Sequence, residues 1–158
     1  MKKLLLLLII PLLSFGQTTM IPDANFEQRL ISFGYDDVLD GTVLTAAIDT
    51  VTQLGVSYYG ISDLTGIEDF TALTYLNCVN NDLTSLDVSQ SANLTDLNCN
   101  DNQLTILDIR NGNNINLVQF NANNNPYLYC TDVDDPTWMY TYWSNWINYS
   151  NLRIFFKN

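Results

Sequence analysis

Internal repetition is the feature of this sequence that most restricts how it can fold. Residues 73–93 read LTYLNCVNNDLTSLDVSQSAN, residues 94–116 read LTDLNCNDNQLTILDIRNGNNIN, and residues 117–135 begin LVQFNANNN. A more divergent unit, residues 51–72, precedes them without a linker. A unit of this length cannot bury its apolar side chains alone, so consecutive units are expected to stack into a solenoid.

The units share the pattern L-x-x-L-x-[LVCA]-x-x-N-x-L, which is the leucine-rich repeat and predicts one strand per coil. In the second unit, the apolar Leu76 and Cys78 alternate with Tyr75, Asn77 and Val79. This alternation is typical of a strand with one buried face. We therefore expect Leu76 and Cys78 to point into the core and the other three side chains to point outward.

The asparagines that follow the strands have a different expected role. Asn81, Asn102 and Asn125 stand where the chain turns inward, and Tyr59 takes this position in the first unit. A side-chain amide can satisfy the backbone groups that such a turn leaves unpaired. We interpret these asparagines as structural.

Three stretches carry a resemblance to a known family. The segments ISDLTGIEDFTALTYLNC and NNDLTSLDVS, with the opening IPDANFEQRLISFGYDD, resemble exported bacterial leucine-rich repeat proteins of the internalin-like, short-repeat type. The resemblance implies an α/β leucine-rich repeat solenoid of about four coils, with a parallel β-sheet on the concave face, an N-terminal helical cap and an aromatic C-terminal cap. It also implies recognition of a protein or a cell surface rather than catalysis.

The first residues have the organisation of an export signal. Two lysines precede the apolar run 4–13, and the small residues Ser14 and Gly16 precede a predicted cut before Gln17. The run is too short to cross a bilayer, which takes about 20 helical residues. We expect a secreted, periplasmic or cell-surface protein with no membrane span after signal cleavage. The predicted organisation is a signal peptide at 1–16, an N-terminal cap at 17–50, leucine-rich repeats at 51–135 and a C-terminal cap at 136–158.

Charge and composition narrow the possible functions. The chain has 17 acidic and 6 basic residues, which gives a formal net charge of −11. Such a surface repels nucleic acid and anionic membranes. The absence of histidine removes the usual general base and the commonest zinc ligand. We expect neither an enzyme nor a cofactor. A hydrolase is the weakest hypothesis, because no base, nucleophile or metal set is visible.

The region before the repeats predicts a helix that covers the first coil. Asp23 is a suitable N-cap, Phe26 and Leu30 lie four residues apart on one helix face, and Gly34 is a natural helix stop.

The loop after this helix, residues 36–47, has the length of a calcium-binding EF-hand loop. Val38 and Ala47 stand at positions where that loop requires side-chain ligands. We therefore favour a glycine-containing turn that leads into a strand around Val43 and Leu44, and calcium binding is the alternative.

Three aspartates align between the units. Asp87, Asp108 and Asp132 each precede the last apolar residue of their unit, so stacking places their carboxylates about 4.8 Å apart. Aspartate commonly accepts hydrogen bonds from its own backbone in turns, which is the interpretation we favour. A cation shared by the carboxylates is the alternative.

Two of the three cysteines occupy the same repeat position. Cys78 and Cys99 stand where the first unit has Val56 and the third has Ala122, which indicates a small buried position. Their side chains point the same way, so we expect two buried thiols rather than a disulfide. A metal site is least favoured because no third ligand is near. Cys130 falls outside the repeat and is either free or paired between chains.

The C-terminal segment is rich in aromatic residues. Trp138, Tyr142 and Trp146 recur every four residues after the helix start at Asp135 and Pro136. We expect a lid over the last coil. The alternative is an aromatic platform for a sugar ring or a partner.

If most of these features are structural, function belongs to the outward side chains of the strands. We predict that the ligand-binding residues on the concave face are Gln53, Ser57, Tyr75, Asn77, Asp96, Asn98, Asn100, Gln119, Asn121 and Asn123. The row of Asn77, Asn98 and Asn121 offers uncharged donors and acceptors, although asparagine also suits a solvated strand face. We hypothesise a secreted module for protein–protein recognition or adhesion through this face. The alternative is a carbohydrate-binding module that uses the asparagine row and the C-terminal aromatics to hold a cell-surface glycan.

Overall fold

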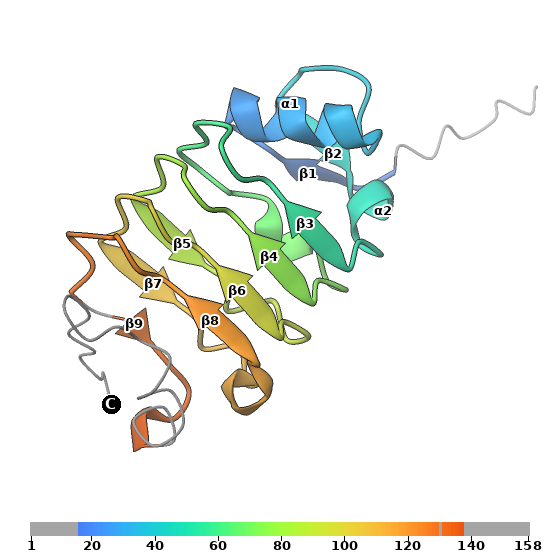
Figure 1. Cartoon of the computed structure of the whole chain (residues 1–158). Helices are drawn as coiled ribbons and strands as arrows, with labels where there is room; N and C mark the ends of the chain where they lie inside the picture. The colour runs from blue at the N-terminus through green and yellow to red at the C-terminus, as the bar shows by residue number, and fades with distance from the viewer. Residues whose placement is uncertain (1–15, 130, 138–158) are drawn as a thin grey trace, which may run out of the picture.

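The chain winds into a solenoid that builds two parallel β-sheets (Figure 1). The computed structural model describes residues 16–129 and 131–137. The first sheet has the order β3-β4-β6-β8, with β3 (Gln53–Gly55), β4 (Tyr75–Asn77), β6 (Asp96–Asn98) and β8 (Gln119–Asn121). The second has the order β5-β7-β9, with β5 (Ser85–Asp87), β7 (Ile106–Asp108) and β9 (Thr131–Asp132). The predicted leucine-rich repeat solenoid with a parallel sheet is confirmed.

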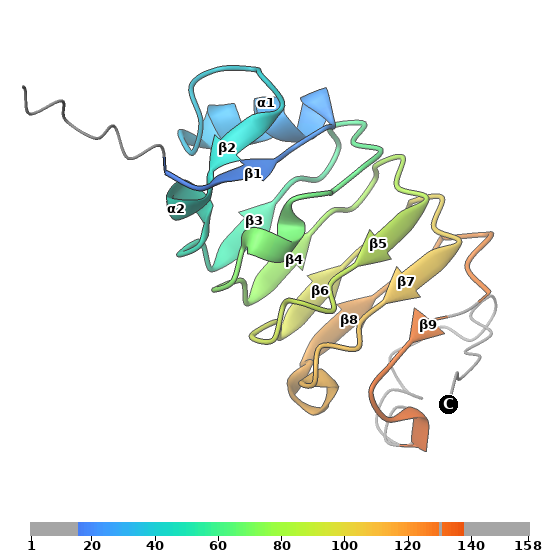
Figure 2. The same cartoon turned by 180° about the vertical axis from the view of Figure 1, so that it is seen from behind.

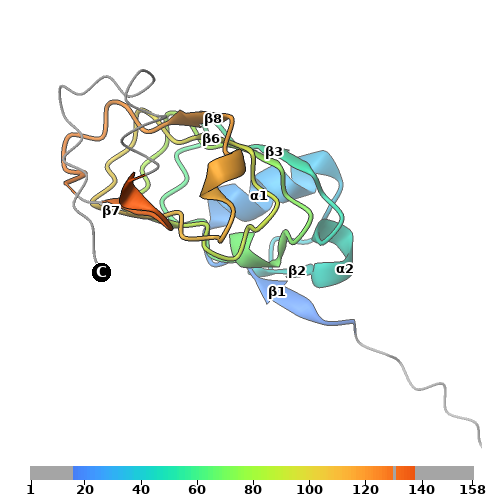
Figure 3. The same ribbon diagram turned by 90° about the horizontal axis from the view of Figure 1, so that it is seen from below.

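The second sheet corrects the expectation of one strand per coil. It is seen from its own side in Figure 2, and Figure 3 shows the two sheets on opposite sides of the coil. In β5 only Leu86 is buried, while Ser85 and Asp87 are exposed. An alternation over three residues is too short to be distinguished in the sequence from a turn that has one buried leucine.

The core lies between the sheets and is built from columns of aligned side chains. Leu54, Leu76, Leu97 and Phe120 pair in register along the first sheet, and all four are buried. Each buried side chain of this size contributes about 1.5–3 kcal/mol relative to leaving it exposed. No coil could complete these columns alone, which is the physical reason why the repeats stack.

The N-terminal region packs against the first coil as a helix and a small sheet. Strands β1 (Thr18–Met20) and β2 (Thr42–Leu44) pair antiparallel, and the helices are α1 (Ala24–Phe33) and α2 (Thr45–Ile48). The predicted start and stop of α1 are confirmed. The Asp23 carboxylate accepts hydrogen bonds from the first backbone N–H groups of the helix, and Gly34 adopts the left-handed conformation with φ 79°.

Side chains of α1 reach the first coil directly. Phe26 and Leu30 are fully buried, and the Phe26 ring lies 6.3 Å from the Phe70 ring, centroid to centroid. Asn25 Nδ2 donates to the carbonyl of Gly60 at 2.9 Å. The second Asp23 oxygen accepts from the backbone N–H and hydroxyl of Ser62, at 2.8 and 2.7 Å.

The loop between α1 and β2 is organised by a residue that the sequence analysis did not identify. Glu27 is buried, and its Oε1 accepts backbone hydrogen bonds from Asp40, Gly41 and Thr42 at 2.6–3.1 Å. Gly41 takes a positive φ of 83°. The expected glycine-containing turn leading into a strand is therefore present.

The structural role of the turn asparagines is confirmed. Asn102 is buried, its Nδ2 donates to the carbonyls of Cys78 and Cys99, and its Oδ1 accepts from the backbone N–H of Leu83. Asn81 and Asn125 make the equivalent bonds one coil away on either side. Each amide thus joins its own coil to the preceding one.

In the first coil, Tyr59 occupies the position of the turn asparagine and is more exposed to solvent than the asparagines. Tyr59 is 41% exposed, and its hydroxyl accepts a hydrogen bond from Arg29 at 2.6 Å. The turn geometry nevertheless persists, because the preceding residue, Tyr58, has a positive φ of 65°, close to the 54–56° of Asn80, Asp101 and Asn124 before the three asparagines.

Cys78 and Cys99 are free and completely buried, as predicted. Burial raises the pKa of the Cys78 thiol to about 12. The pKa of Cys99 is also raised well above its ordinary value, first by burial and then by the neighbouring Cys78. Both side chains therefore act as small core residues.

Several predicted features lie outside the described residues: most of the signal peptide, Cys130, and the aromatic residues from Trp138 onward. Within residues 16–129 and 131–137, no helix has the length and apolar character needed to cross a membrane.

Candidate functional site

The first sheet brings most of the predicted ligand-binding residues together on its outer face. A hollow of about 240 Å³ lies over β4, β6 and β8. Six predicted residues line it: Tyr75, Asp96, Asn98, Gln119, Asn121 and Asn123. The other four, Gln53, Ser57, Asn77 and Asn100, are not part of its lining.

The repeat positions the hollow because each coil supplies the same three-residue strand in register. Asn77, Asn98 and Asn121 pair along the sheet, and Asp96 lies between Tyr75 and Gln119 in a second row. The sequence analysis did not identify Leu97 and Phe120 as part of the lining. Phe120, a larger residue than the leucine of the preceding coils, is the available sequence signal for this apolar component.

The carboxamide oxygens of the asparagine row are used within the protein. Asn77 Oδ1 accepts from the backbone N–H of Val79 at 3.2 Å, and Asn121 Oδ1 accepts from that of Asn123 at 3.1 Å. Asn98 makes the same bond to Asn100 at 3.5 Å. The oxygens of this row therefore cap the strand ends, a role that the sequence analysis did not predict for these residues.

The amide nitrogens of the row differ from one another. Asn77 Nδ2 donates to the Tyr75 hydroxyl at 3.2 Å, and Asn77 Oδ1 also accepts from the Ser57 hydroxyl at 2.8 Å. Within the described part of the chain, the Nδ2 groups of Asn98 and Asn121 make no hydrogen bond. These two nitrogens are therefore available as donors at the hollow, and the 3.1 Å bond to the Asn121 oxygen orients that side chain more firmly than the 3.5 Å contact orients Asn98.

Neighbouring polar groups complete this surface. Asp96 is partly buried and accepts a hydrogen bond from the Thr95 hydroxyl at 2.7 Å. Asn100 Nδ2 donates to Asp101 at 2.7 Å, while Asn100 Oδ1 is buried without a hydrogen-bond partner among the described residues. The hollow therefore combines amide donors, one carboxylate and apolar surface.

The expected outward orientation of Val79 is wrong, because this side chain is only 9% exposed. Its backbone carbonyl accepts from Tyr58, one of the residues with positive φ. Val79 follows the end of β4, so the alternation of the strand no longer fixes its direction.

The aspartates of the second sheet stack in register, as predicted. Asp87 Oδ1 accepts from the backbone N–H of Ser89 at 2.8 Å, and Asp108 Oδ1 accepts from that of Arg110 at 3.0 Å. The turn-capping interpretation is confirmed for these two residues.

The positive charge next to these carboxylates belongs to a side chain that the sequence analysis did not place there. The Arg110 guanidinium hydrogen-bonds Asp108 and lies 3.4 Å from Asp132. The side-chain hydrogen bond from Arg110 lowers the pKa of Asp108 below 3.8, against the opposing effect of burial. In the sequence, the signal for this ion pair is that Arg110 stands two residues after Asp108.

No family model matches the sequence. Over 83 residues the chain is 35% identical to internalin J of Listeria monocytogenes, a match that spans 50% of this chain and 9% of that protein. Among solved structures, the functional domain of InlJ from L. monocytogenes, described as including a cysteine ladder, aligns with a TM-score of 0.60 and 29% identity. That alignment covers 90% of this chain and 28% of the other.

The fold is also similar to that of the internalin InlF from L. monocytogenes, with a TM-score of 0.56 and 22% identity over 88% of this chain and 46% of that one. The chain thus spans less than half the length of each of these three proteins. The repeat pattern, the stacked coils and the similarity to internalin J agree with one another. The chain is a leucine-rich repeat solenoid that is similar in sequence and fold to internalin J.

Proposed function

We propose that the chain is a secreted module that recognises a protein partner through the outer face of the first sheet. The observation that carries this proposal is the pair of available amide donors, Asn98 Nδ2 and Asn121 Nδ2, at the hollow over β4, β6 and β8. Its similarity to internalins supports a role in protein recognition or adhesion.

The chemistry of the hollow suits an uncharged or basic polypeptide surface. Two amide donors on neighbouring strands, about 4.8 Å apart, can pair with carbonyl oxygens of the partner. The half-exposed ring of Tyr75 offers a small apolar contact area, and Asp96 favours a basic group nearby. The glycan alternative depends largely on aromatic residues outside the described part of the chain, and nothing in the described hollow favours it.

The proposal is tested by probing an array that carries both purified extracellular proteins and glycans. We expect binding to a protein on the array, lost in the double variant Asn98→Asp with Asn121→Asp. Aspartate keeps the oxygen that caps the strand end and removes the NH₂ donor. Because the two new carboxylates are paired across neighbouring strands, circular dichroism of the variant must show that the solenoid is still folded. Binding confined to glycans, or protein binding that the double variant leaves intact, would contradict the proposal.

Export is part of the same proposal and rests on the N-terminal sequence. Gln17 already belongs to the folded region, because its carbonyl accepts from the backbone N–H of Thr45 at 2.9 Å. A cut after Gly16 therefore leaves this contact in place. Expression in a bacterium that exports proteins should yield a product outside the cytoplasm whose N-terminus, by mass spectrometry, is Gln17. A product that retains Met1 would contradict export by cleavage.

A further inference from the structure

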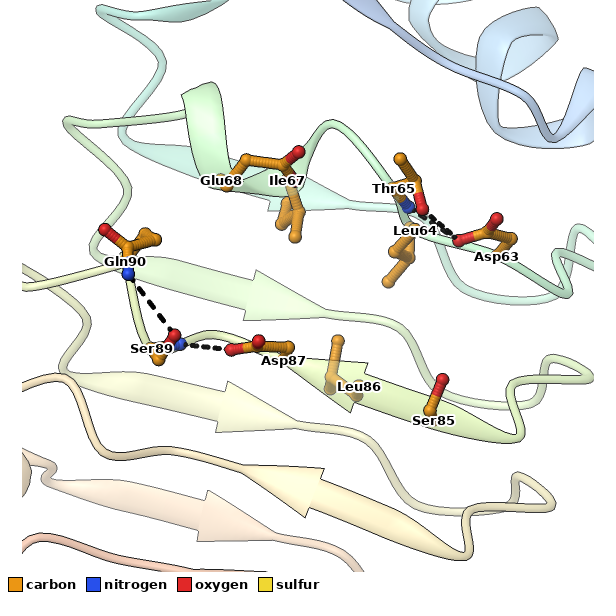
Figure 4. Close-up of a pocket in the computed structure, with 10 residues that line it drawn as sticks. All are labelled: Asp63, Leu64, Thr65, Ile67, Glu68, Ser85, Leu86, Asp87, Ser89 and Gln90. Carbon is orange, nitrogen blue, oxygen red and sulfur yellow. Dashed lines mark hydrogen bonds between the residues drawn. The ribbon is translucent and has the colours of Figure 1, made fainter.

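A second open surface lies on the opposite sheet, away from the proposed recognition face. A groove of about 380 Å³ separates the first coil, at residues 63–68, from β5 and the residues that follow it (Figure 4). Leu64 of the first coil takes the repeat position of Leu86 in β5, yet only β5 is a strand of the second sheet. The second sheet thus ends one coil earlier than the first.

The first coil turns away from β5 because its polar groups bond locally. Asp63 Oδ1 accepts from the backbone N–H and hydroxyl of Thr65 at 2.8 and 2.7 Å, and Glu68 Oε2 accepts from the backbone N–H of Gly66 at 2.8 Å. A 3₁₀ turn, η1 (Ile67–Asp69), follows. The groove therefore arises from side chains that occupy the donors a neighbouring strand would need.

Gly66 fixes the position of this turn. Its φ is 101°, and a Cβ atom at this position would lie 2.6 Å from the backbone carbonyl oxygen of Met20 in β1. The first coil is thus held close to the N-terminal sheet, on the side of the coil away from β5. The groove is a consequence of this packing and not of a loose segment.

The edge of β5 that faces the groove carries unpaired backbone groups. Thr84 and Val88, on either side of β5, bond to the next coil. The Thr84 carbonyl accepts from the N–H of Thr105, and the Val88 N–H donates to the carbonyl of Asp108. In a parallel ladder the bonding direction alternates along the strand, so the N–H and C=O groups of Ser85 and Asp87 point to the groove.

Among the described residues, none of these groups bonds the first coil. The last backbone contact between the two coils before the groove is Asp82 N–H to the Ile61 carbonyl, at 2.8 Å. Unpaired edge groups of this kind are a template for an added strand.

The charge of the groove indicates which kind of polypeptide segment can add to the second sheet there. Its lining includes the exposed carboxylates of Asp63, Glu68 and Asp87 and contains no basic residue. Leu64 and Leu86 also line the groove, but their side chains are almost fully buried in the core. Such a groove attracts lysine and arginine side chains, and the net charge of −11 opposes a second copy of this chain.

We propose that the groove binds an extended basic polypeptide segment, which adds to the second sheet as a strand alongside β5. The backbone of the segment pairs with Ser85 and Asp87, and its basic side chains lie against Asp63, Glu68 and Asp87. This site is separate from the hollow on the first sheet, so the two surfaces can be tested independently.

The test uses a fluorescein-labelled octapeptide of alternating lysine and valine, titrated with the protein and followed by fluorescence anisotropy. We expect saturable binding, and at least about tenfold weaker binding of the matched peptide of alternating glutamate and valine. The triple variant Asp63→Asn, Glu68→Gln, Asp87→Asn keeps the acceptor oxygens that hold the turns and should also weaken binding at least about tenfold. Asn98→Asp with Asn121→Asp should bind the peptide as the unchanged protein does.

Strand addition is distinguished from electrostatic adhesion by the backbone. Ser85→Pro removes an edge N–H at a position where proline is tolerated, and should abolish binding, while the control Ser85→Thr should preserve it. A peptide N-methylated on alternate amides in either register should not bind.

Three results would overturn the proposal: binding insensitive to the triple variant, binding insensitive to both Ser85→Pro and N-methylation, or no saturable binding. Concentration-dependent dimerisation that Ser85→Pro removes, measured by analytical ultracentrifugation, would assign the edge to a second copy instead.

Discussion

Asparagine serves two purposes in this chain, and the two are separated by which atoms of the side chain bond within the protein. Asn102 uses both its nitrogen and its oxygen inside the coil, whereas Asn98 uses its oxygen alone. Repetition in the sequence was enough to predict the buried role of Asn81, Asn102 and Asn125. Repetition could not predict that the side-chain nitrogen of Asn77 bonds within the protein while those of Asn98 and Asn121 do not. The orientation of a carboxamide is set by contacts that only the folded turn creates.

At the residue scale, the first prediction concerns the buried asparagines. Asn102→Ala leaves the N–H of Leu83 without its acceptor, while the carbonyls of Cys78 and Cys99 each lose one of two amide donors and keep the other, from Asn81 and Asn125. We expect the free energy of unfolding to fall by about 2–3 kcal/mol, because one buried unsatisfied group costs about 1–3 kcal/mol and the two lost donor bonds add to it. Urea denaturation measures this loss.

The matched control is Asn93→Ala. Asn93 is exposed and makes one hydrogen bond, from its Nδ2 to the carbonyl of Thr71 at 3.0 Å. Its removal should cost no more than about 1 kcal/mol. Equal losses for the two variants would argue against the bridging role of the buried amides.

The second prediction at this scale concerns the thiols. With a pKa of about 12, the buried Cys78 has about one thiolate in ten thousand molecules at pH 8. Iodoacetamide should therefore leave Cys78 and Cys99 unmodified in the folded protein and alkylate both in guanidinium chloride, as peptide mass spectrometry can follow. A disulfide-linked pair of these peptides, or alkylation in the native state at the rate of a free thiol, would contradict this assignment.

At the scale of elements, the three-residue strands set the limit of what sequence can predict. The strands of the first sheet follow from the repeat pattern, which places a fixed apolar position in each. In β5 and β7 a single buried leucine stands between residues that are exposed or partly buried, and the partner strand, not the local sequence, makes these segments strands. The predicted aspartate stack follows from repetition all the same, because register between coils is fixed by the first sheet.

The prediction at this scale concerns the carboxylate of Asp108. Because its pKa in the folded protein lies below 3.8, the stabilisation from Arg110 is fully present above that pH and is lost as the pH falls through the lower, folded-state value. In Arg110→Gln, the pKa of Asp108 should rise toward 3.8, as an NMR titration of the side-chain carboxyl carbon can measure.

The control for this prediction is Arg110→Lys, which keeps the positive charge and should preserve part of the shift. The difference in stability between Arg110→Gln and the unchanged protein should also diminish as the pH falls below 3.8. An unchanged Asp108 pKa in Arg110→Gln would show that the guanidinium does not cause the shift.

At the scale of the whole molecule, the solenoid presents two chemically different sheets. The first sheet carries amide donors over β6 and β8, and the second carries stacked carboxylates with an open edge at β5. The repeat pattern was sufficient to predict the solenoid and its first sheet, but not the second sheet. The hollow and the groove were not predicted, because each depends on how neighbouring coils meet in the folded protein.

The measurement that tests the central claim most directly is the affinity of the array-identified protein partner for three forms of the chain, by isothermal titration calorimetry. The unchanged protein and Ser85→Thr should bind equally, whereas Asn98→Asp with Asn121→Asp, folded by circular dichroism at the temperature of the titration, should bind at least about tenfold more weakly. Equal affinity in all three forms would contradict the assignment of recognition to the first sheet.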